Sequence, residues 1–365
     1  MNVCILGNGL TSLTLAKNLI NKKINVHIYH KKKINNFLSN RTVGISKNNI
    51  NFFEKEINQL PKKIIWEIKN IEIYSDKMEK GKILNFENDK KNLFYMVQND
   101  ELYKSLNKKL VKNKFFSKRI IKHNNFYANL LKKNNYDLII NCDQENPISK
   151  KYFAKTINKD YKNLAYTTIL EHEKLVNNTA VQIFTKFGPI AFLPISKTKT
   201  SVVYSIEIKN KKYNNDEVFD LIRKNNPKFK IKKFFKLNSF QLKSSNLRNY
   251  YYKNILAFGD LLHKIHPLAG QGFNMTIRDI KILSEIIQNK IDLGMQLDSS
   301  IFDEFEKKTK HINFIFSNGI DFIYEIFNFE KKIKGKSLSK ILRYFGKNKR
   351  LTNTLIKFAD RGFII

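Results

Sequence analysis

The sequence is short of cysteine, of acidic residues and of long apolar runs, and each shortage excludes a class of protein. Two cysteines in 365 residues cannot form the disulfide framework of a secreted domain. No apolar run approaches the roughly 18 residues that a transmembrane helix needs. No charged leader precedes the apolar run at residues 3–6. We therefore expect the mature chain to start at Met1 and to lie in the cytosol, either free or peripheral to the inner membrane.

Acidic residues are strongly outnumbered, since 32 Asp and Glu stand against 67 Lys and Arg and give a formal net charge of +35. Such a charge suits nucleic acid or an anionic membrane surface. The lysines are spread along the whole chain, however, and no nucleic-acid recognition module is visible. We interpret the charge as a compositional bias and expect no nucleic-acid partner.

The first thirty residues predict an α/β fold. Residues 3–6 form a short buried run, residues 7–12 read GNGLTS, and an apolar stripe with helical spacing follows. Residues 26–29 then predict a second strand, which completes the start of a β-α-β unit. The strand-rich stretch at 164–208 favours an antiparallel sheet elsewhere in the fold.

We expect two interleaved domains and a helical end, because no flexible linker separates these segments. The fold class is therefore α/β, or α+β overall, with a Rossmann-type dinucleotide-binding domain, an antiparallel-sheet substrate domain and a C-terminal helical region. The expected ranges are 1–70, 98–160 and 250–295 for the first domain, 71–97 and 161–249 for the second, and 296–365 for the helical region.

The glycine motif at residues 7–12 predicts a site for a pyrophosphate. Gly7 suits a tight turn, and Gly9 lets backbone approach the phosphates at the positive end of the following helix. Ser12 is small enough for close helix–strand packing. The predicted second strand ends in His30, where such sites usually carry Asp or Glu for the ribose hydroxyls. The lysines at 31–33 would instead suit an additional phosphate.

A second motif joins ILAFGD at 255–260 to HPLAGQGFN at 266–274, with Asp279 on the helix that follows. Here the chain resembles the FAD-dependent aromatic hydroxylases of the para-hydroxybenzoate hydroxylase fold, and most closely their ubiquinone-biosynthesis branch. The resemblance implies that Asp260 binds the ribityl chain. It also implies that the helix beginning near residue 270 directs its N-terminus at the flavin, and that Pro267 lies against the ring.

Further segments agree with this family. RTVGIS at 41–46 makes Arg41 a candidate contact, and Gln98 precedes a helix that reaches the flavin side chain in the family, although helix capping by Asn99 is an equal alternative. FGPIAFLP at 187–194 resembles the substrate-domain sheet. The stretch at 143–150 departs from the family, because Asp143 remains but a glycine is missing. The expected cofactor-binding residues are Gly7, Gly9, Leu10, Thr11, Ser12, His30, Arg41, Gln98, Asp143, Gly259, Asp260, Pro267, Gly270, Gln271, Gly272, Phe273 and Asn274.

The resemblance implies a flavoprotein monooxygenase that binds FAD and uses NAD(P)H as electron donor. Through a flavin C4a-hydroperoxide, O2 would hydroxylate a polyprenylated phenol in ubiquinone biosynthesis. This chemistry needs no catalytic acid or base, and we assign none. We also predict no metal site, because no further ligand stands near His263 and His266.

Two other functions remain open: hydroxylation of a small soluble aromatic, and a degenerate flavoprotein that acts as a scaffold. The expected partners are the phenol, O2, a membrane surface and other ubiquinone-biosynthesis proteins. The apolar and basic tail at 338–358 either packs on the core or lies on anionic lipid.

Overall fold

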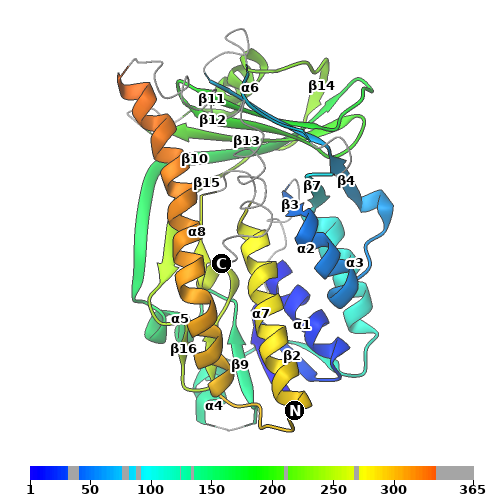
Figure 1. The fold of residues 1–365 in the computed structure, drawn as a ribbon, viewed down its shortest axis with the longest axis vertical. Coiled ribbons are helices and arrows are strands. Elements are labelled where there is room, and N and C mark those ends of the chain that lie inside the picture. The colour runs from blue at the N-terminus through cyan, green and yellow to red at the C-terminus, as the bar shows by residue number, and fades with distance from the viewer. Residues whose placement is uncertain are drawn as a thin grey trace.

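The computed structural model describes residues 1–31, 41–75, 82–87, 92–123, 125–132, 135–208, 213–266 and 271–333. Pro267, Gly270 and the tail beyond residue 333, all singled out above, lie outside these residues. The described chain forms a mostly parallel sheet, a large antiparallel sheet and a small one, with helices around them (Figure 1). The predicted α/β class is therefore confirmed.

The mostly parallel sheet contains the first apolar run of the sequence. Its strand order is β16-β17-β9-β1-β2-β8, and every neighbouring pair is parallel except β16 with β17. Val3, Cys4 and Ile5 in β1 are completely buried, which is typical of a parallel sheet covered on both faces. The strands are β1 (Asn2–Leu6), β2 (Asn25–His30), β8 (Phe116–Ile120), β9 (Leu138–Asn141), β16 (Tyr251–Tyr252) and β17 (Ile255–Ala257).

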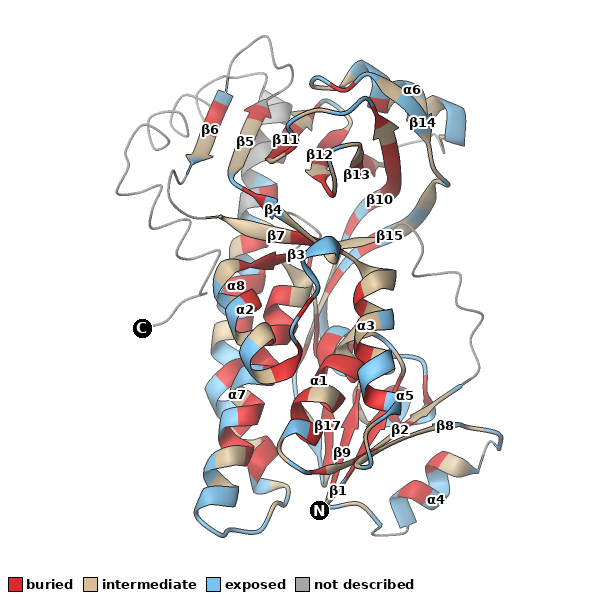
Figure 2. Ribbon diagram, turned by 90° about the vertical axis from the view of Figure 1, so that its right-hand side faces the viewer, coloured by how far each residue is buried: buried red, intermediate tan, exposed pale blue. Residues whose placement is uncertain are grey.

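Helices pack against this sheet and against each other through apolar stripes. In α1, Leu13, Ala16 and Ile20 are at most 3% exposed, as their helical spacing predicts. Helix α1 contacts both α3 and α7, and Figure 2 shows buried residues gathered where these helices meet. The helices are α1 (Leu10–Asn21), α2 (Lys47–Phe52), α3 (Asn99–Val111), α4 (Phe126–Lys132), α5 (Pro147–Tyr152) and α7 (Gly272–Asp292).

The large sheet confirms the predicted antiparallel layer. Its order is β18-β15-β10-β13-β12-β11-β5-β6, with β14 also paired to β10, and only the β11–β5 pair is parallel. Helix α6 (Asn215–Lys224) begins with a capping box between Asn214 and Glu217. The strands are β5 (Asn70–Ser75), β6 (Lys82–Glu87), β10 (Thr156–His172), β11 (Thr179–Thr185), β12 (Gly188–Pro194), β13 (Lys199–Glu207), β14 (Ile231–Phe234), β15 (Asn238–Leu247) and β18 (His263–Lys264).

A third, three-stranded sheet was not predicted. Strands β3 (Thr42–Ser46) and β4 (Ile65–Ile68) both pair antiparallel with β7 (Phe94–Gln98). Thr42 Oγ1 donates to Ser201 Oγ of β13 at 3.0 Å, so this sheet is tied to the large one. A π-helical turn at Phe53–Ile57 and a 3-10 turn at Lys62–Ile64 connect it to α2.

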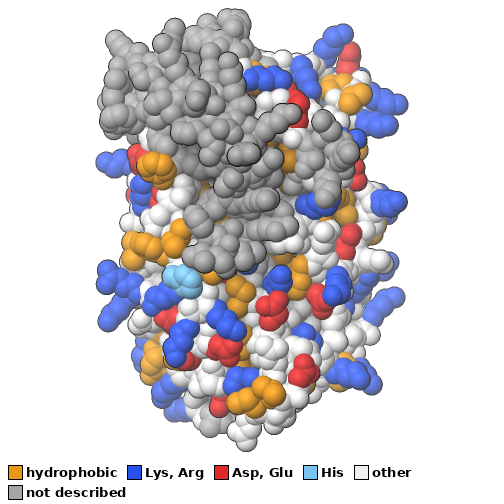
Figure 3. All heavy atoms as spheres, viewed as in Figure 1, with side chains coloured by type: hydrophobic (Ala, Val, Ile, Leu, Met, Phe, Trp, Pro, Cys, Tyr) orange, Lys and Arg blue, Asp and Glu red, His pale blue; other side chains and the backbone are white. Residues whose placement is uncertain are grey.

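Helix α8 (Ser300–Ile333) runs alongside both main layers (Figure 1). Its Phe302 and Phe305 are fully buried, and Ser317 Oγ accepts a hydrogen bond from Asn246 Nδ2 of β15 at 2.9 Å. Among the residues described, no helix is long and apolar enough to cross a membrane. Lys and Arg side chains are scattered over the coloured part of the surface in Figure 3, which agrees with a compositional origin of the net charge.

Candidate functional site

The predicted glycine motif forms a tight loop between β1 and α1. Gly7 has φ +114°, in a region that favours glycine, and its N–H donates to Tyr29 O at 2.9 Å. A Cβ atom at Gly7 would lie 3.3 Å from Ser12 Oγ and 3.4 Å from the carbonyl carbon of Cys142. The loop therefore lies close to both the first turn of α1 and the end of β9. Leu10 is half-buried and Ser12 is buried, so the first turn of α1 is firmly seated.

Gly9 leaves open space in front of α1. It is the N-cap residue, no side chain caps the helix, and the first turn contains no acidic residue. A Cβ atom at Gly9 would meet nothing within 4 Å. The N–H groups at the positive end of α1 are therefore available to an anion that approaches past Gly9.

The second motif meets this loop directly. Gly259 has φ +65°, and a Cβ atom there would lie 2.7 Å from Thr11 Cγ2, so only glycine allows the 3-10 turn at Gly259–Leu261 to touch α1. The next residue, Asp260, has an exposed side chain, while its carbonyl accepts a hydrogen bond from Gln144 Nε2. A solvent-exposed carboxylate thus lies beside the glycine loop.

Arg41 lies near Asp260, on the same side of the fold as the glycine loop. Burial lowers the pKa of its guanidinium, and the nearby Asp260 carboxylate acts in the opposite direction. The guanidinium also lies 4.9 Å from the ring centroid of Phe240 in β15. Arg41 therefore joins the parallel sheet's edge to the large antiparallel sheet.

Asp143 lies at the end of β9, with its backbone N–H near Gly7. One of its carboxylate oxygens accepts the N–H of Glu145 at 3.0 Å, and its carbonyl accepts from Ser149 Oγ at 2.5 Å. Asn141 donates to the same Ser149 hydroxyl at 2.8 Å. The stretch that departs from the family is thus an internally bonded turn, in which the second carboxylate oxygen of Asp143, Oδ2, has no hydrogen bond within the described ranges.

The N-terminus of α7 lies against β3 and α2. Gln271 is the N-cap residue, but its side chain does not cap the helix, and its buried Oε1 has no hydrogen-bond partner within the described ranges. At Gly272 a Cβ atom would have only Ile265 Cγ1 near it, at 4.0 Å. Phe273 packs half-buried against the core. Among the described residues, this helix end therefore has a buried acceptor without a hydrogen bond and open space at Gly272.

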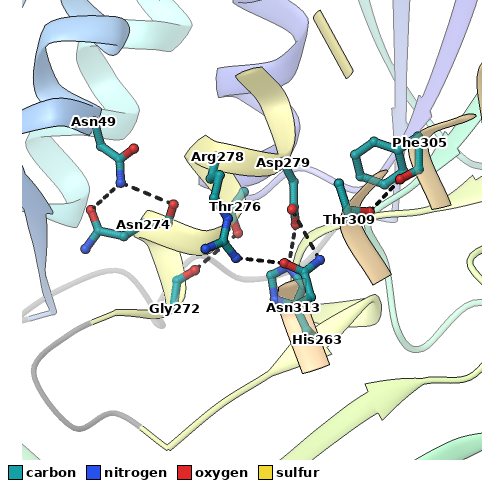
Figure 4. A network of polar contacts seen from close by, with 10 residues as sticks. All are labelled: Asn49, His263, Gly272, Asn274, Thr276, Arg278, Asp279, Phe305, Thr309 and Asn313. Atoms are coloured by element: carbon teal, nitrogen blue, oxygen red, sulfur yellow. Dashed lines mark hydrogen bonds and ion pairs between the residues drawn. The ribbon is translucent and has the colours of Figure 1, made fainter. Parts of the chain in front are cut away.

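Asn274 contacts protein through both ends of its amide, and its contacts with Asn49 are drawn in Figure 4. Its Oδ1 accepts from Ser46 N at 2.8 Å and from Asn49 Nδ2 at 3.0 Å, and its Nδ2 donates to Gly44 O at 2.9 Å. These bonds fix β3 and α2 to the first turn of α7. These bonds use the amide oxygen and one of the two amide N–H groups of Asn274, and its backbone lies at the helix end.

His30 and Gln98 lie at strand ends, as predicted. His30 Nδ1 is 3.0 Å from the Lys31 carbonyl oxygen, so this nitrogen is directed at its own backbone. Gln98 pairs with Thr42 and is the N-cap residue of α3, without a side-chain capping bond. Asn99 is the first residue inside the helix, so the alternative in which Asn99 caps α3 is wrong.

A buried polar network behind α7 was not predicted (Figure 4). His263 Nε2 bonds to Asp279 Oδ2, and Asp279 Oδ1 accepts from Asn313 Nδ2 at 3.3 Å. Arg278 Nη2 donates to Asn313 Oδ1 at 2.8 Å. All three of His263, Asp279 and Asn313 are at most 3% exposed. The network ties α8 and β18 to the helix whose N-terminus faces the site.

His266 takes no part in that network. Its ring contacts Tyr161 edge-on and Tyr324 in a tilted arrangement, at centroid distances of 4.8 and 4.5 Å. Burial, with a smaller contribution from Lys159, lowers its pKa to about 3. In the described residues no group of three His, Cys, Asp or Glu side chains could hold a metal ion.

The low pKa of His266 predicts a loss of stability in acid. Between the unfolded value of 6.5 and the folded value of about 3 the unfolded chain binds the extra proton, so stability falls as the pH drops through this window. The slope from this group is at most about 1.4 kcal/mol per pH unit. Urea unfolding from about pH 7 to about pH 4 should show a shallower decline for His266→Phe than for the wild type. The exposed His311→Phe is the control, and equal slopes for all three proteins would contradict the prediction.

The fold is shared with solved monooxygenases that include FAD-dependent ones. The structure is similar to that of p-nitrophenol 4-monooxygenase PnpA from Pseudomonas putida, with a TM-score of 0.79 and 11% identity over 99% of this chain and 98% of that one. HpxO from Klebsiella pneumoniae, solved with FAD and uric acid, gives a TM-score of 0.74 and 11% identity over 98% and 96% of the two chains. At these identities the likeness establishes the fold.

The chain belongs to the squalene epoxidase family, whose sequence profile matches residues 138–360. It is 27% identical over 241 residues to the mitochondrial ubiquinone biosynthesis monooxygenase COQ6 of Dictyostelium discoideum, covering 52% of this chain and 49% of the relative. It is 29% identical over 153 residues to the 3-demethoxyubiquinol 3-hydroxylase of Escherichia coli, covering 40% and 39%. The chain thus spans about half or less of the length of these curated relatives. They confirm the resemblance to the ubiquinone-biosynthesis hydroxylases.

Proposed function

We propose that this protein binds FAD along the edge formed by the glycine loop, Asp260 and the N-terminus of α7, and hydroxylates a polyprenylated phenol in ubiquinone biosynthesis. The open space in front of the uncapped α1 at Gly9 carries the proposal. The relatives named as ubiquinone-biosynthesis monooxygenase and ubiquinol hydroxylase support the choice of substrate class.

The residues present fit FAD. The pyrophosphate would be held by the backbone of Gly7, Gly9, Leu10, Thr11 and Ser12, and the ribityl chain by Asp260. Arg41 would neutralise charge at the same edge. The Gln271 acceptor, which has no partner among the described residues, would face the flavin ring together with the space at Gly272. When bound, the flavin supplies the chemistry that activates O2 for transfer of one oxygen atom to an aromatic ring.

The protein's own contribution is to bind, orient and exclude water. The positive end of α7 would stabilise negative charge on the reduced ring. The hydrogen bond from Thr42 to Ser201 holds β3 against β13, and the Arg41–Phe240 contact closes the site toward the large sheet. We assign no catalytic acid or base.

The proposed function includes a division of the chain into domains, an electron donor and partners. The FAD-binding domain comprises residues 1–70, 98–160 and 250–295, and the substrate domain 71–97 and 161–249, with the helical region at 296–365. NAD(P)H is the proposed electron donor. Contact with the inner membrane surface, where such a phenol dissolves, and with other ubiquinone-biosynthesis proteins completes the proposal.

Turnover of a prenylated phenol tests the proposed function. Purified protein with FAD and NADPH should convert such a phenol to a product one oxygen atom heavier, detected by mass spectrometry, and should oxidise more NADPH with the phenol than without it. The same ring without its prenyl tail should react much more slowly. Preference for the small phenol would favour the soluble-aromatic alternative. Absence of product from both would favour the scaffold.

A further inference from the structure

A lysine that has no acidic partner among the described residues lies near the glycine loop. Lys118 lies in β8, and its Nζ is 3.1 Å from Tyr103 Oη and 3.2 Å from Asn107 Oδ1. Nζ is also 5.5 Å from the centroid of the Tyr103 ring. The ion pairs of the described residues do not include Lys118. In the described part of the chain, the ammonium group therefore bonds only to neutral acceptors.

Tyr103 connects this lysine to the loop. Its hydroxyl donates to Asn8 Oδ1 at 2.9 Å, and Asn8 lies between Gly7 and Gly9. Because a hydroxyl has one proton and two lone pairs, it can accept from Lys118 while it donates to Asn8. The ammonium group is thus one side chain away from the expected pyrophosphate site.

The geometry leaves part of the ammonium group unused. Lys118 has three N–H donors, and its two acceptors in the described chain, Tyr103 and Asn107, use two of them. The side chain is half-buried, so its attraction for an anion is screened less than that of a fully exposed lysine. If Lys118 only connected β8 to α3, a neutral donor would serve as well, because Tyr103 and Asn107 are both neutral acceptors.

The histidine at the end of β2 also leaves the positive charge of Lys118 in place. His30 pairs with Ile120, two residues beyond Lys118 on β8. An Asp or Glu in place of His30 would put a negative charge near Lys118 and offset it. Because the residue is His30, no carboxylate at the end of β2 offsets the charge of Lys118.

We propose that Lys118 is a binding residue for the pyrophosphate of the dinucleotide. This inference rests on the proposed binding of FAD and adds to it a residue outside both sequence motifs. The third N–H of Lys118 donates to a phosphate oxygen, while Tyr103 holds Asn8 and the loop in place.

The test compares Lys118→Gln with Lys114→Gln. Glutamine at 118 can still donate to Tyr103 and Asn107 but has no charge, and Lys114 is an exposed lysine four residues earlier whose Nζ lies over Phe115. Calorimetry with ADP and with riboflavin separates the two halves of FAD. Lys118→Gln should bind ADP about tenfold more weakly, with a shallower salt dependence and unchanged riboflavin affinity. Lys118→Arg, which keeps the charge, should lose less.

The outcomes separate this inference from the function on which it rests. If Lys118→Gln binds ADP as Lys114→Gln does, the inference is wrong and FAD binding is unaffected. If the wild type binds neither ADP nor FAD, both proposals are wrong. Should Lys118→Gln fail to fold, a flat salt dependence of ADP binding by the wild type would overturn the inference, and a steep one that Lys118→Arg preserves would support it.

Discussion

Replacing Gly9 with valine should abolish FAD binding while leaving the fold intact. Gly9 has φ −89° and ψ −178°, an extended conformation that valine adopts readily, and a Cβ atom there meets no protein atom within 4 Å. The branched side chain would instead fill the space through which phosphates reach the N-terminus of α1. We expect the dissociation constant of FAD to rise at least about 100-fold, a loss of about 3 kcal/mol or more.

Thermal unfolding of the apo protein is the control for Gly9→Val. An N-cap valine in place of glycine should cost at most about 1 kcal/mol, so the melting temperature should fall only slightly. Gly9→Ala adds a single methyl group and should give an intermediate affinity. If Gly9→Val binds FAD as the wild type does, the pyrophosphate does not pass Gly9 and the proposed position of the cofactor is wrong.

Replacing Asp279 with alanine should destabilise the protein strongly. The carboxylate is fully buried and accepts from both His263 and Asn313, so its removal leaves two buried polar groups without their partner. Breaking a buried pair in this way costs about 3–5 kcal/mol. Urea unfolding, followed by circular dichroism, should show a much lower midpoint, because α7 loses its connection to α8 and β18.

Asp303→Ala is the matched control, since Asp303 lies near the start of α8, is only half-buried, and pairs with Lys307 at 2.6 Å and accepts a long hydrogen bond of 3.4 Å from Tyr251. Its loss should cost at most about 1 kcal/mol. The double variant Asp279→Ala with His263→Phe should be less destabilised than the sum of the two single variants, because the two residues share one interaction. Additive effects would show that the His263–Asp279 bond does not couple β18 to α7.

The parts of the fold that could be predicted are those whose signal is local. The buried run at 3–6, the glycines at 7 and 9 and the stripe in α1 lie within twenty residues of each other, and each follows from spacing alone. The strand and Gly-Asp turn at 255–260 could be predicted in the same way. The contact of Gly259 with Thr11 explains why a glycine occupies position 259.

The parts that could not be predicted depend on contacts between distant residues. Strand β3 owes its pairing to β7, about fifty residues later, so its short run gives no periodic signal of its own. The network joins His263 to Asn313 through Asp279 across 50 positions. Lys118 is one of 67 basic residues, and only its neutral neighbours and the nearby loop distinguish it. Sequence patterns give periodicity, but they do not give the partner of a polar side chain.

Titration of the purified protein with FAD, followed by its absorbance and by quenching of flavin fluorescence, tests the central claim most directly. The account predicts saturable binding of one FAD per chain, with a flavin spectrum that stays with the protein through gel filtration, and loss of this binding in Gly9→Val. A folded wild-type protein that stays colourless and does not quench FAD at any accessible concentration would contradict the account and leave the scaffold as the better reading.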